Sequence, residues 1–107
     1  IAMLKIYRKE HDVDRLAPFK VFLNGMELCT MANGETKDYN LKAGTYKFKV
    51  TGGGFHSKEL EVELFDDEII QLVFYPAYKD NKMDKFMYKN VFGGEAIYLE
   101  VDKDFYL

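Results

Sequence analysis

The residues best suited to catalysis are scarce in this chain and widely spaced. There are only two histidines, His11 in a charged segment and His56 after a glycine-rich turn, and Ser57 is the sole serine. Two distant histidines predict neither a His-based triad nor a multi-histidine metal site. His56 and Ser57 are adjacent, but neighbouring side chains of an extended chain point to opposite faces, so we do not expect a nucleophile and base pair. The sequence therefore predicts that the protein is not an enzyme.

The patterns that hold metals or cofactors in other proteins are incomplete here. Cys29 is the only cysteine, and in a strand-like run it is expected to be a buried, inert thiol. The run Gly52-Gly53-Gly54 lacks the Gly-Lys-Ser/Thr ending of a phosphate-binding loop. The acidic runs at 66–68 and 102–104 lack the spaced ligands and the central glycine of a calcium loop. We therefore expect no metal and no cofactor.

Aromatic residues are the one chemical surplus. Between residues 75 and 92, tyrosines and phenylalanines lie among lysines, and such rings contribute large contact area to a binding surface at little entropic cost. The residues proposed for this surface are Tyr75, Tyr78, Phe86 and Tyr88. Its expected ligand is a protein partner or a glycan, although the chain has no Trp to act as the strongest stacking platform. The alternative is that these rings only cover the open end of the fold.

Length, charge and composition limit the remaining function classes. The 107 residues are enough for a single domain, residues 1–107, that buries a core without disulfides. A net charge of -3 offers no field that attracts phosphate backbones, so no nucleic-acid partner is expected. No apolar run approaches the roughly 20 residues of a transmembrane helix, and no signal-peptide pattern opens the chain. Because position 1 is Ile rather than Met, the start of the chain leaves the compartment open, and the oligomeric state is open as well.

Short alternating apolar runs separated by turn signals indicate an all-β fold. Asn-Gly and Gly-Gly pairs supply the positive φ angles of tight hairpins, and Gly93-Gly94 predicts a last hairpin before the final strand. Residues 80–90 carry apolar side chains at both helical and strand spacing, so the fold includes either a short helix there or a further strand. We expect an antiparallel immunoglobulin-like β-sandwich of about seven to eight strands. The strands predicted with defined ends are 3–8, 19–23, 26–31, 45–50, 58–64, 68–75 and 95–101.

One pair of strands has a specific predicted register. Three glutamates share one face of residues 58–64, and they repel one another unless basic side chains lie beside them. With residues 51–57 as a connecting loop, an antiparallel partner places Lys47 opposite Glu61 and Lys49 opposite Glu59. The alternative is a divalent-cation or basic-partner site on the glutamate row, but hard cations prefer converging oxygens from a loop to a flat row on one strand.

Several segments of turn and strand resemble one known group of small β modules. They are Val21-Phe22-Leu23-Asn24-Gly25, the run from Leu41 to Val50, Gly54-Phe55, and the run from Leu60 to Phe74, which together make up about half of the chain. These segments are similar to the PEGA type of β-sandwich, with Leu41-Lys42-Ala43-Gly44 where that group has Pro-Glu-Gly-Ala. The resemblance implies an immunoglobulin-like sandwich that acts as a non-catalytic module, often on surface or envelope proteins. It therefore favours an extracytoplasmic location.

Two functions from different classes follow from these observations. The first is a non-catalytic interaction or structural module of a larger cell-envelope or surface protein. The β fold, the PEGA-like turns and the lack of catalytic residues favour it. The second is a carbohydrate-binding module that uses the aromatic surface near residues 75–92.

Overall fold

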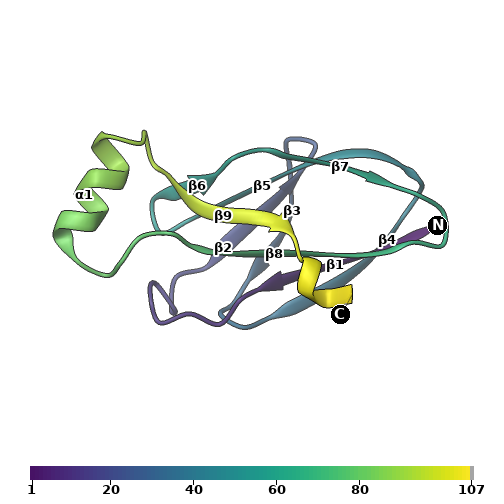
Figure 1. Cartoon of the computed structure of the whole chain (residues 1–107), viewed down its shortest axis with the longest axis horizontal. Coiled ribbons are helices and arrows are strands. Elements are labelled where there is room, and N and C mark those ends of the chain that lie inside the picture. The colour runs from purple at the N-terminus through teal and green to yellow at the C-terminus, as the bar shows by residue number, and fades with distance from the viewer. Residues whose placement is uncertain (107) are drawn as a thin grey trace.

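The computed structural model describes residues 1–106, which form nine strands of one sheet, an α-helix and a short C-terminal 3-10 helix. The sheet curves into an incomplete barrel, and α1 (Lys82–Asn90) lies across one end of the 45 Å long axis (Figure 1). The 3-10 helix is η1 (Lys103–Tyr106). The strands are β1 (Ala2–Arg8), β2 (Phe19–Leu23), β3 (Met26–Met31), β4 (Thr36–Leu41), β5 (Gly44–Gly52), β6 (Phe55–Ser57), β7 (Leu60–Leu64), β8 (Ile69–Pro76) and β9 (Glu95–Val101).

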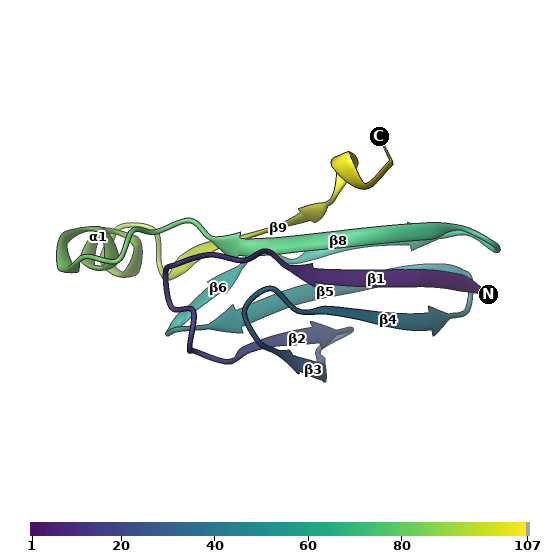
Figure 2. The same cartoon turned by 90° about the horizontal axis from the view of Figure 1, so that it is seen from below.

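The sheet contains both parallel and antiparallel pairs. Its strand order is β3-β2-β5-β6-β9-β8-β1-β4, and β7 pairs with the part of β5 that β6 leaves free. The parallel pairs are β1 with β8 and β6 with β9. The two outermost strands, β3 and β4, meet at the short connection between them (Figure 2), where Lys37 Nζ on β4 donates a 3.0 Å hydrogen bond to the Thr30 carbonyl on β3. No main-chain ladder joins these two strands within residues 1–106, so the barrel stays open there.

This topology contradicts the predicted antiparallel immunoglobulin-like sandwich. The chain is all-β with one short helix, but it forms a single mixed, barrel-like sheet rather than two packed antiparallel sheets. The predicted strands were paired through tight turns, and tight turns produce only antiparallel neighbours. Both parallel pairs join segments that are distant in the sequence, as when Met3–Arg8 lies alongside Ile69–Phe74. Alternating apolar side chains identify a strand but not its distant partner.

Two local predictions, the turn at Asn24-Gly25 and the final strand, are confirmed. Asn24 and Gly25, in the turn between β2 and β3, both have positive φ angles of 50° and 81°. The final strand covers residues 95–101 as predicted. Two strands lie outside the prediction: β4, and β6 in a segment predicted as a loop.

The predicted register of β5 and β7 is confirmed up to Phe48 and Leu60, where the ladder ends, so the predicted Lys49–Glu59 position lies outside it. Lys47 lies opposite Glu61, and Phe48 lies opposite Leu60 on the other face. Lys47 Nζ approaches Glu59 to 3.9 Å, diagonally across the pair, and both side chains are largely exposed. The glutamate row is therefore balanced by lysine as expected, with the ion pair shifted by one position on the strand face.

A buried arginine connects the first loop to the barrel. The Arg8 guanidinium donates hydrogen bonds of 2.7 to 2.9 Å to the main-chain carbonyls of Asp14, Ala17 and Met31. It also stacks on the Phe19 ring, 4.1 Å from the ring centroid. Arg8 is only 2% exposed, and burial lowers its pKa from the usual value. This network fixes the loop that carries Asp14 at the α1 end of the barrel.

Residues 82–90 form a helix, so of the two alternatives that the apolar spacing allowed, a short helix or a further strand, the helix is the one observed. Asn81 caps the N-terminus of α1, because its side-chain oxygen accepts a 2.7 Å hydrogen bond from the Asp84 N–H. After α1, Gly93 and Gly94 have φ angles of 63° and 84° and turn the chain into β9. The glycine pair therefore joins a helix to a strand, and the predicted last hairpin is wrong.

Candidate ligand site beside strand β9

The four aromatic residues proposed from the sequence do not share one surface. Tyr78 is 1% exposed, and its hydroxyl donates a hydrogen bond to the Asp14 carboxylate. Phe86 is exposed on α1. Tyr88 lines a cavity beside β9, and Tyr75 lies on β8 next to that cavity. The structure therefore places two of the four residues near one candidate site.

Tyr78 anchors the linker between β8 and α1. Its ring packs on Phe55 with centroids 4.2 Å apart. The Asp14 carboxylate that accepts its hydrogen bond also lies 3.8 Å from Lys85 Nζ on α1, and Lys85 Nζ lies 3.0 Å from Asp80. Burial, followed by the hydrogen bond to Asp14, raises the pKa of Tyr78 above its ordinary value. This cluster holds α1 against the barrel and so positions the residues of the neighbouring cavity.

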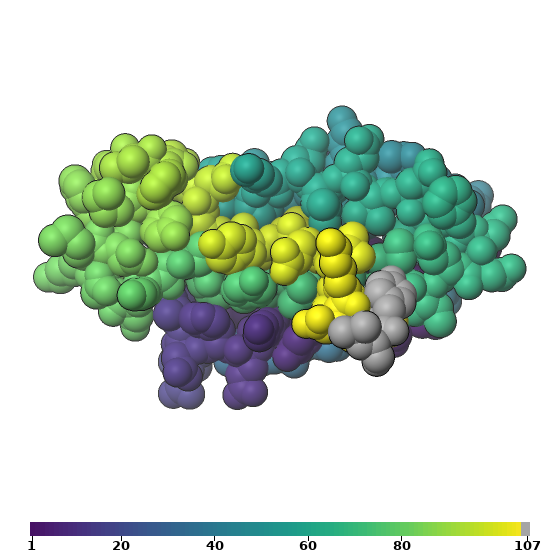
Figure 3. Space-filling view, viewed as in Figure 1, coloured from purple at the N-terminus to yellow at the C-terminus, as the bar shows by residue number. Residues whose placement is uncertain are grey.

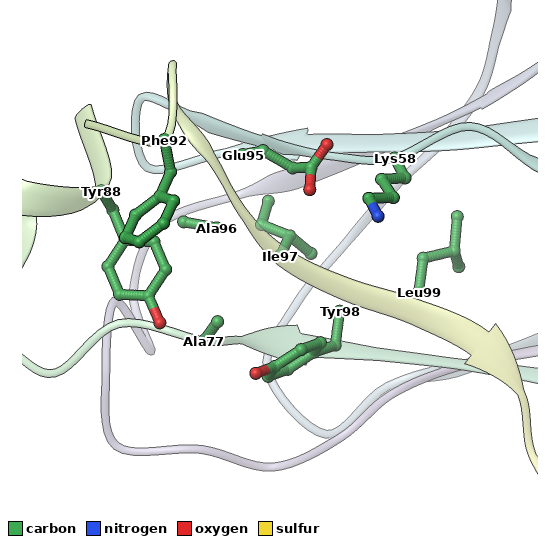
Figure 4. A pocket seen from close by; sticks show the side chains of 9 residues that line it. All are labelled: Lys58, Ala77, Tyr88, Phe92, Glu95, Ala96, Ile97, Tyr98 and Leu99. Carbon is green, nitrogen blue, oxygen red and sulfur yellow. The ribbon is translucent and has the colours of Figure 1, made fainter. Parts of the chain in front are cut away.

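The cavity has a volume of about 430 Å³ and lies where the end of α1 meets β9 (Figure 4). Strand β9 contributes most of its wall. The end of α1 and the segment after it contribute two aromatic rings, the β8–α1 linker contributes Ala77, and the chain between β6 and β7 contributes Lys58. The lining residues are Lys58, Ala77, Tyr88, Phe92, Glu95, Ala96, Ile97, Tyr98 and Leu99.

Main-chain hydrogen bonds hold the wall of the cavity in place. The Gly94 N–H donates to the Tyr88 carbonyl at 2.9 Å, which closes the segment after α1. The His56 N–H donates to the Gly94 carbonyl at 2.9 Å, and the Ala77 N–H donates to the Ala96 carbonyl at 2.8 Å. Both sides of β9 are thus bonded at this end of the cavity. A wall fixed in this way costs little further ordering when a ligand binds.

Aromatic rings provide the main apolar contact surface. The rings of Tyr88 and Phe92 lie side by side at one end of the cavity (Figure 4), with centroids 5.3 Å apart. Tyr98 projects from β9 toward solvent, and its ring centroid lies 5.2 Å from that of Tyr75 on β8. Lys9 Nζ lies 5.1 Å from the Tyr75 ring centroid. The rings therefore form a partly exposed surface that continues from the cavity onto β8.

The charged groups of the rim have both signs. Lys58 and Glu95 project on the same side of β9, across the strand from Tyr98 (Figure 4). Glu100 lies further along β9, and its carboxylate is a secondary cause, after burial, of a raised pKa at Tyr75. The Tyr75 hydroxyl therefore stays protonated at neutral pH and is available as a hydrogen-bond donor.

Beyond the cavity, no strand within residues 1–106 pairs with the outer edge of β9. The parallel ladder with β6 ends at Ser57 and Ile97, and β7 pairs with β5 alone. The Asp102 N–H donates a 2.8 Å hydrogen bond to the Gln71 carbonyl on the β8 side. In the antiparallel ladder with β8, the main-chain N–H and C=O groups of the even-numbered residues of β9 therefore point toward β8. By alternation, the N–H and C=O groups of Leu99 and Val101 point to the open side. Figure 3 shows β9 at the surface of the molecule.

Ser57 marks the point where the chain leaves β9. Its hydroxyl oxygen accepts a 2.9 Å hydrogen bond from the Val50 N–H and donates a 2.7 Å hydrogen bond to the Lys58 carbonyl. The side chain therefore takes the place of a main-chain acceptor in the ladder with β5, and the strand can change direction there. From the sequence, Ser57 was predicted only to lack a catalytic role, and its structural role depends on a kink that composition does not reveal.

The polar members of the candidate site, Tyr98, Lys58 and Glu95, are among the lining residues that were not identified from the sequence. Tyr98 was recognised only as part of the final strand. Pairing of the last two strands would have revealed it, because an antiparallel β8–β9 register brings Tyr75 and Tyr98 together on one face. Lys58 and Glu95 come together through the parallel β6–β9 pair, for which the sequence carries no signal.

Comparisons with protein-family models, curated proteins and solved structures find no match for this chain. The resemblance to PEGA modules therefore stays a prediction. Within residues 1–106, no helix is long and apolar enough to cross a membrane. The described residues contain no group of three or more His, Cys, Asp or Glu side chains placed to hold a metal ion.

Proposed function

We propose that this domain is a non-catalytic interaction module that binds an extended segment of a protein partner along the open edge of β9. The observation that carries the proposal is the unpaired outer edge of β9 directly beside the aromatic cavity. Exposed strand edges are templates for pairing with another chain. In this mode of recognition, main-chain hydrogen bonds provide affinity and pockets for alternate side chains provide specificity.

The dimensions of the site suit such a segment. Side chains on one face of an added strand recur about every 7 Å, so one of them would enter the cavity while its main chain pairs with Leu99. The cavity is lined by Tyr88, Phe92 and Ile97, which favours an aliphatic or aromatic side chain. The rigid rings contribute contact area without a large entropic cost.

The charge near the edge favours a partner segment that carries basic residues. Glu95 and Glu100 lie on β9 and Asp102 follows it, whereas Lys58 is the one lysine that lines the cavity. Complementary charge mainly increases the rate of association and selects among partners. We therefore infer a motif in which an apolar residue is flanked by lysine or arginine.

Carbohydrate binding is the second candidate function. The exposed rings of Phe92 and Tyr98 beside a polar rim favour it, because a sugar ring can stack on such rings while its hydroxyl groups bond to Lys58 and Glu95. This alternative uses the side chains of the site and makes no use of the strand edge.

A library of random peptides of about ten residues, long enough for one added strand, tests the first proposal. We expect selected peptides to carry an apolar residue between basic ones. Leu99→Pro should weaken their binding about three- to tenfold, because it removes one outward N–H, worth about 0.5–1.5 kcal/mol, and leaves the bonds to β8 intact. Ala77→Phe should abolish binding by filling the cavity. Ala43→Phe, in the exposed turn before β5, is the matched control.

Leu99→Pro and a further variant, Tyr98→Ala, separate the two candidate functions on a glycan array. Glycan binding should be lost with Tyr98→Ala and retained with Leu99→Pro, whereas peptide binding depends on the main chain at Leu99. Thermal unfolding of each variant verifies that the domain still folds. Selected peptides that bind Leu99→Pro and Ala77→Phe as tightly as the unaltered protein would contradict the strand-edge proposal.

A further inference from the structure

Helix α1 is oriented with its apolar side toward solvent. A helix on the surface of a globular protein normally turns its apolar stripe toward the core. No residue of α1 is buried, and several of its large apolar side chains are exposed. We define the outer face of α1 as Met83, Phe86, Met87 and Val91, all of which are exposed.

Polar residues of α1 contact the barrel instead. Lys85 bridges Asp14 and Asp80 through its ammonium group. Lys89 Nζ lies 5.4 Å from the centroid of the Phe55 ring. Because these residues occupy the side of the helix that meets the barrel, the outer face points away from the body of the molecule. Figures 1 and 3 show α1 forming the end of the long axis.

The region around the outer face is positively charged. Residues 79–92 contain four lysines and two aspartates, a net charge of +2 that Asp14, in contact with Lys85, reduces to +1, in a chain whose net charge is -3. Lys79 and Lys82 are exposed, and Lys82 directly precedes Met83 of the outer face. A protruding helix with an apolar face and flanking lysines has the composition of a helix that lies in a lipid interface.

We propose that the outer face of α1 docks this domain onto an anionic lipid bilayer. The helix lies across the end of the molecule, so its axis can lie in the plane of the membrane while the barrel extends away from it (Figure 2). Phe86 and Met83 enter the boundary between headgroups and acyl chains, and the lysines contact anionic headgroups. This inference does not depend on the strand-edge proposal.

A second copy of the chain is a poorer occupant. The four partly exposed side chains offer roughly 500 Å² of surface, below the roughly 800 Å² per partner of a stable protein interface. Pairing two outer faces would also bring Lys82 of each copy together, and like charges oppose association.

Cosedimentation with vesicles tests the proposal. The probes are phosphatidylcholine vesicles with and without about one third phosphatidylserine. We expect binding only to the anionic vesicles, with a loss of about fivefold for each of Lys79→Gln and Lys82→Gln, and a further loss when salt rises from about 0.1 M to about 1 M. Met83→Ser combined with Phe86→Ser should reduce binding at least tenfold. Met26→Ser is the matched control, because Met26 and Met83 are both 75% exposed.

A second measurement does not depend on loss of binding. The chain has no Trp, so a single introduced indole reports its own environment. Phe86 is 61% exposed and Phe65, in the turn between β7 and β8 at the other end of the molecule, is 59% exposed. We expect the emission of Phe86→Trp to shift to shorter wavelength with anionic vesicles and that of Phe65→Trp to stay unchanged.

Three results would overturn the proposal. One is the absence of binding to anionic vesicles, and another is an equal spectral shift at positions 86 and 65. The third is a concentration-dependent dimer that Phe86→Ser dissolves, which would assign the outer face to a second copy of the chain.

Discussion

Removal of the Tyr78 hydroxyl should destabilise the domain at neutral pH and make it less sensitive to alkali. In Tyr78→Phe the ring still packs on Phe55, but Asp14 loses the hydrogen bond from the hydroxyl. A hydrogen bond to a charged group contributes about 1.5–3 kcal/mol. We expect a loss within this range, nearer the lower end because Lys85 Nζ, 3.8 Å from Asp14, still faces the carboxylate.

The pH dependence follows from the raised pKa of Tyr78, which burial and the bond to Asp14 cause. The folded state holds this proton more tightly than the unfolded state, whose pKa is near 10. The stability contributed by the proton is complete below pH 10 and is lost as pH rises from 10 toward the folded pKa. The phenylalanine variant has no such proton, so at about pH 11 the difference between the two proteins should shrink by about 1.4 kcal/mol.

Urea unfolding of both proteins at several pH values provides the measurement. Between about pH 6 and pH 8 the difference should be constant, because the tyrosine is protonated in both states there. Burial and the neighbouring Cys29 raise the pKa of Tyr39 to about 12, so Tyr39 also destabilises the fold in alkali. Both proteins contain Tyr39, and its effect therefore cancels in the difference between their free energies of unfolding. A difference that stays constant up to about pH 11 would refute the argument that Tyr78 keeps its proton in the folded state.

Three further predictions concern the barrel. Ser57→Ala should cost about 1–3 kcal/mol in denaturant unfolding, because a buried N–H of β5 loses its acceptor, whereas Ser57→Thr should retain most of that stability. Gly52→Ala should lower the free energy of unfolding by about 1–3 kcal/mol or more, because the added Cβ would lie 2.3 Å from the ring of Phe19, which is buried and cannot move aside. An unchanged denaturation midpoint would show that the ring adjusts freely. A double-mutant cycle on Lys47 and Glu59, whose charged groups lie 3.9 Å apart, should give a coupling of about 0.2–1 kcal/mol that falls with added salt, and a coupling of zero at low salt would contradict an electrostatic role for the register.

Features set by short stretches of chain were predictable from the sequence. The turn at Asn24-Gly25 requires positive φ at both residues, and few other residue pairs provide it, so its position is legible in the sequence. The β5–β7 register was predictable because charges on one face and apolar residues on the other satisfy only one alignment. In both cases the residues that determine the structure are close along the chain.

The architecture and the candidate site were less predictable because they depend on distant segments. The pair β1–β8 joins the first and eighth strands, and no residue in either strand specifies the other as its partner. Tyr78 looked like a surface aromatic in a lysine-rich segment, yet Asp14, more than 60 positions earlier in the chain, provides a buried partner for its hydroxyl. The cavity combines residues from the β6–β7 connection, α1 and β9, so its lining could be identified only once these elements were in place.

The open edge of β9 and the bend at Ser57 have a common cause in β5. The end of β5 pairs with β6 at Thr51 and Gly52, and its first half pairs with β7 from Gly44 to Phe48. Because β6 and β7 both pair with β5, the chain must leave β9 after Ser57. The Ser57 hydroxyl donates its bond to the Lys58 carbonyl at that point. Within the described residues, the outer strands β3 and β4 also end the sheet without a further strand, but Lys37 Nζ on β4 bonds to the Thr30 carbonyl on β3 and so occupies part of that edge. Because β7 pairs with β5, the part of β9 beyond Ile97 has no neighbouring strand from residues 1–106 on its outer side, and an extended partner segment could pair there. For this reason we place the proposed binding site at β9 rather than at the outer strands.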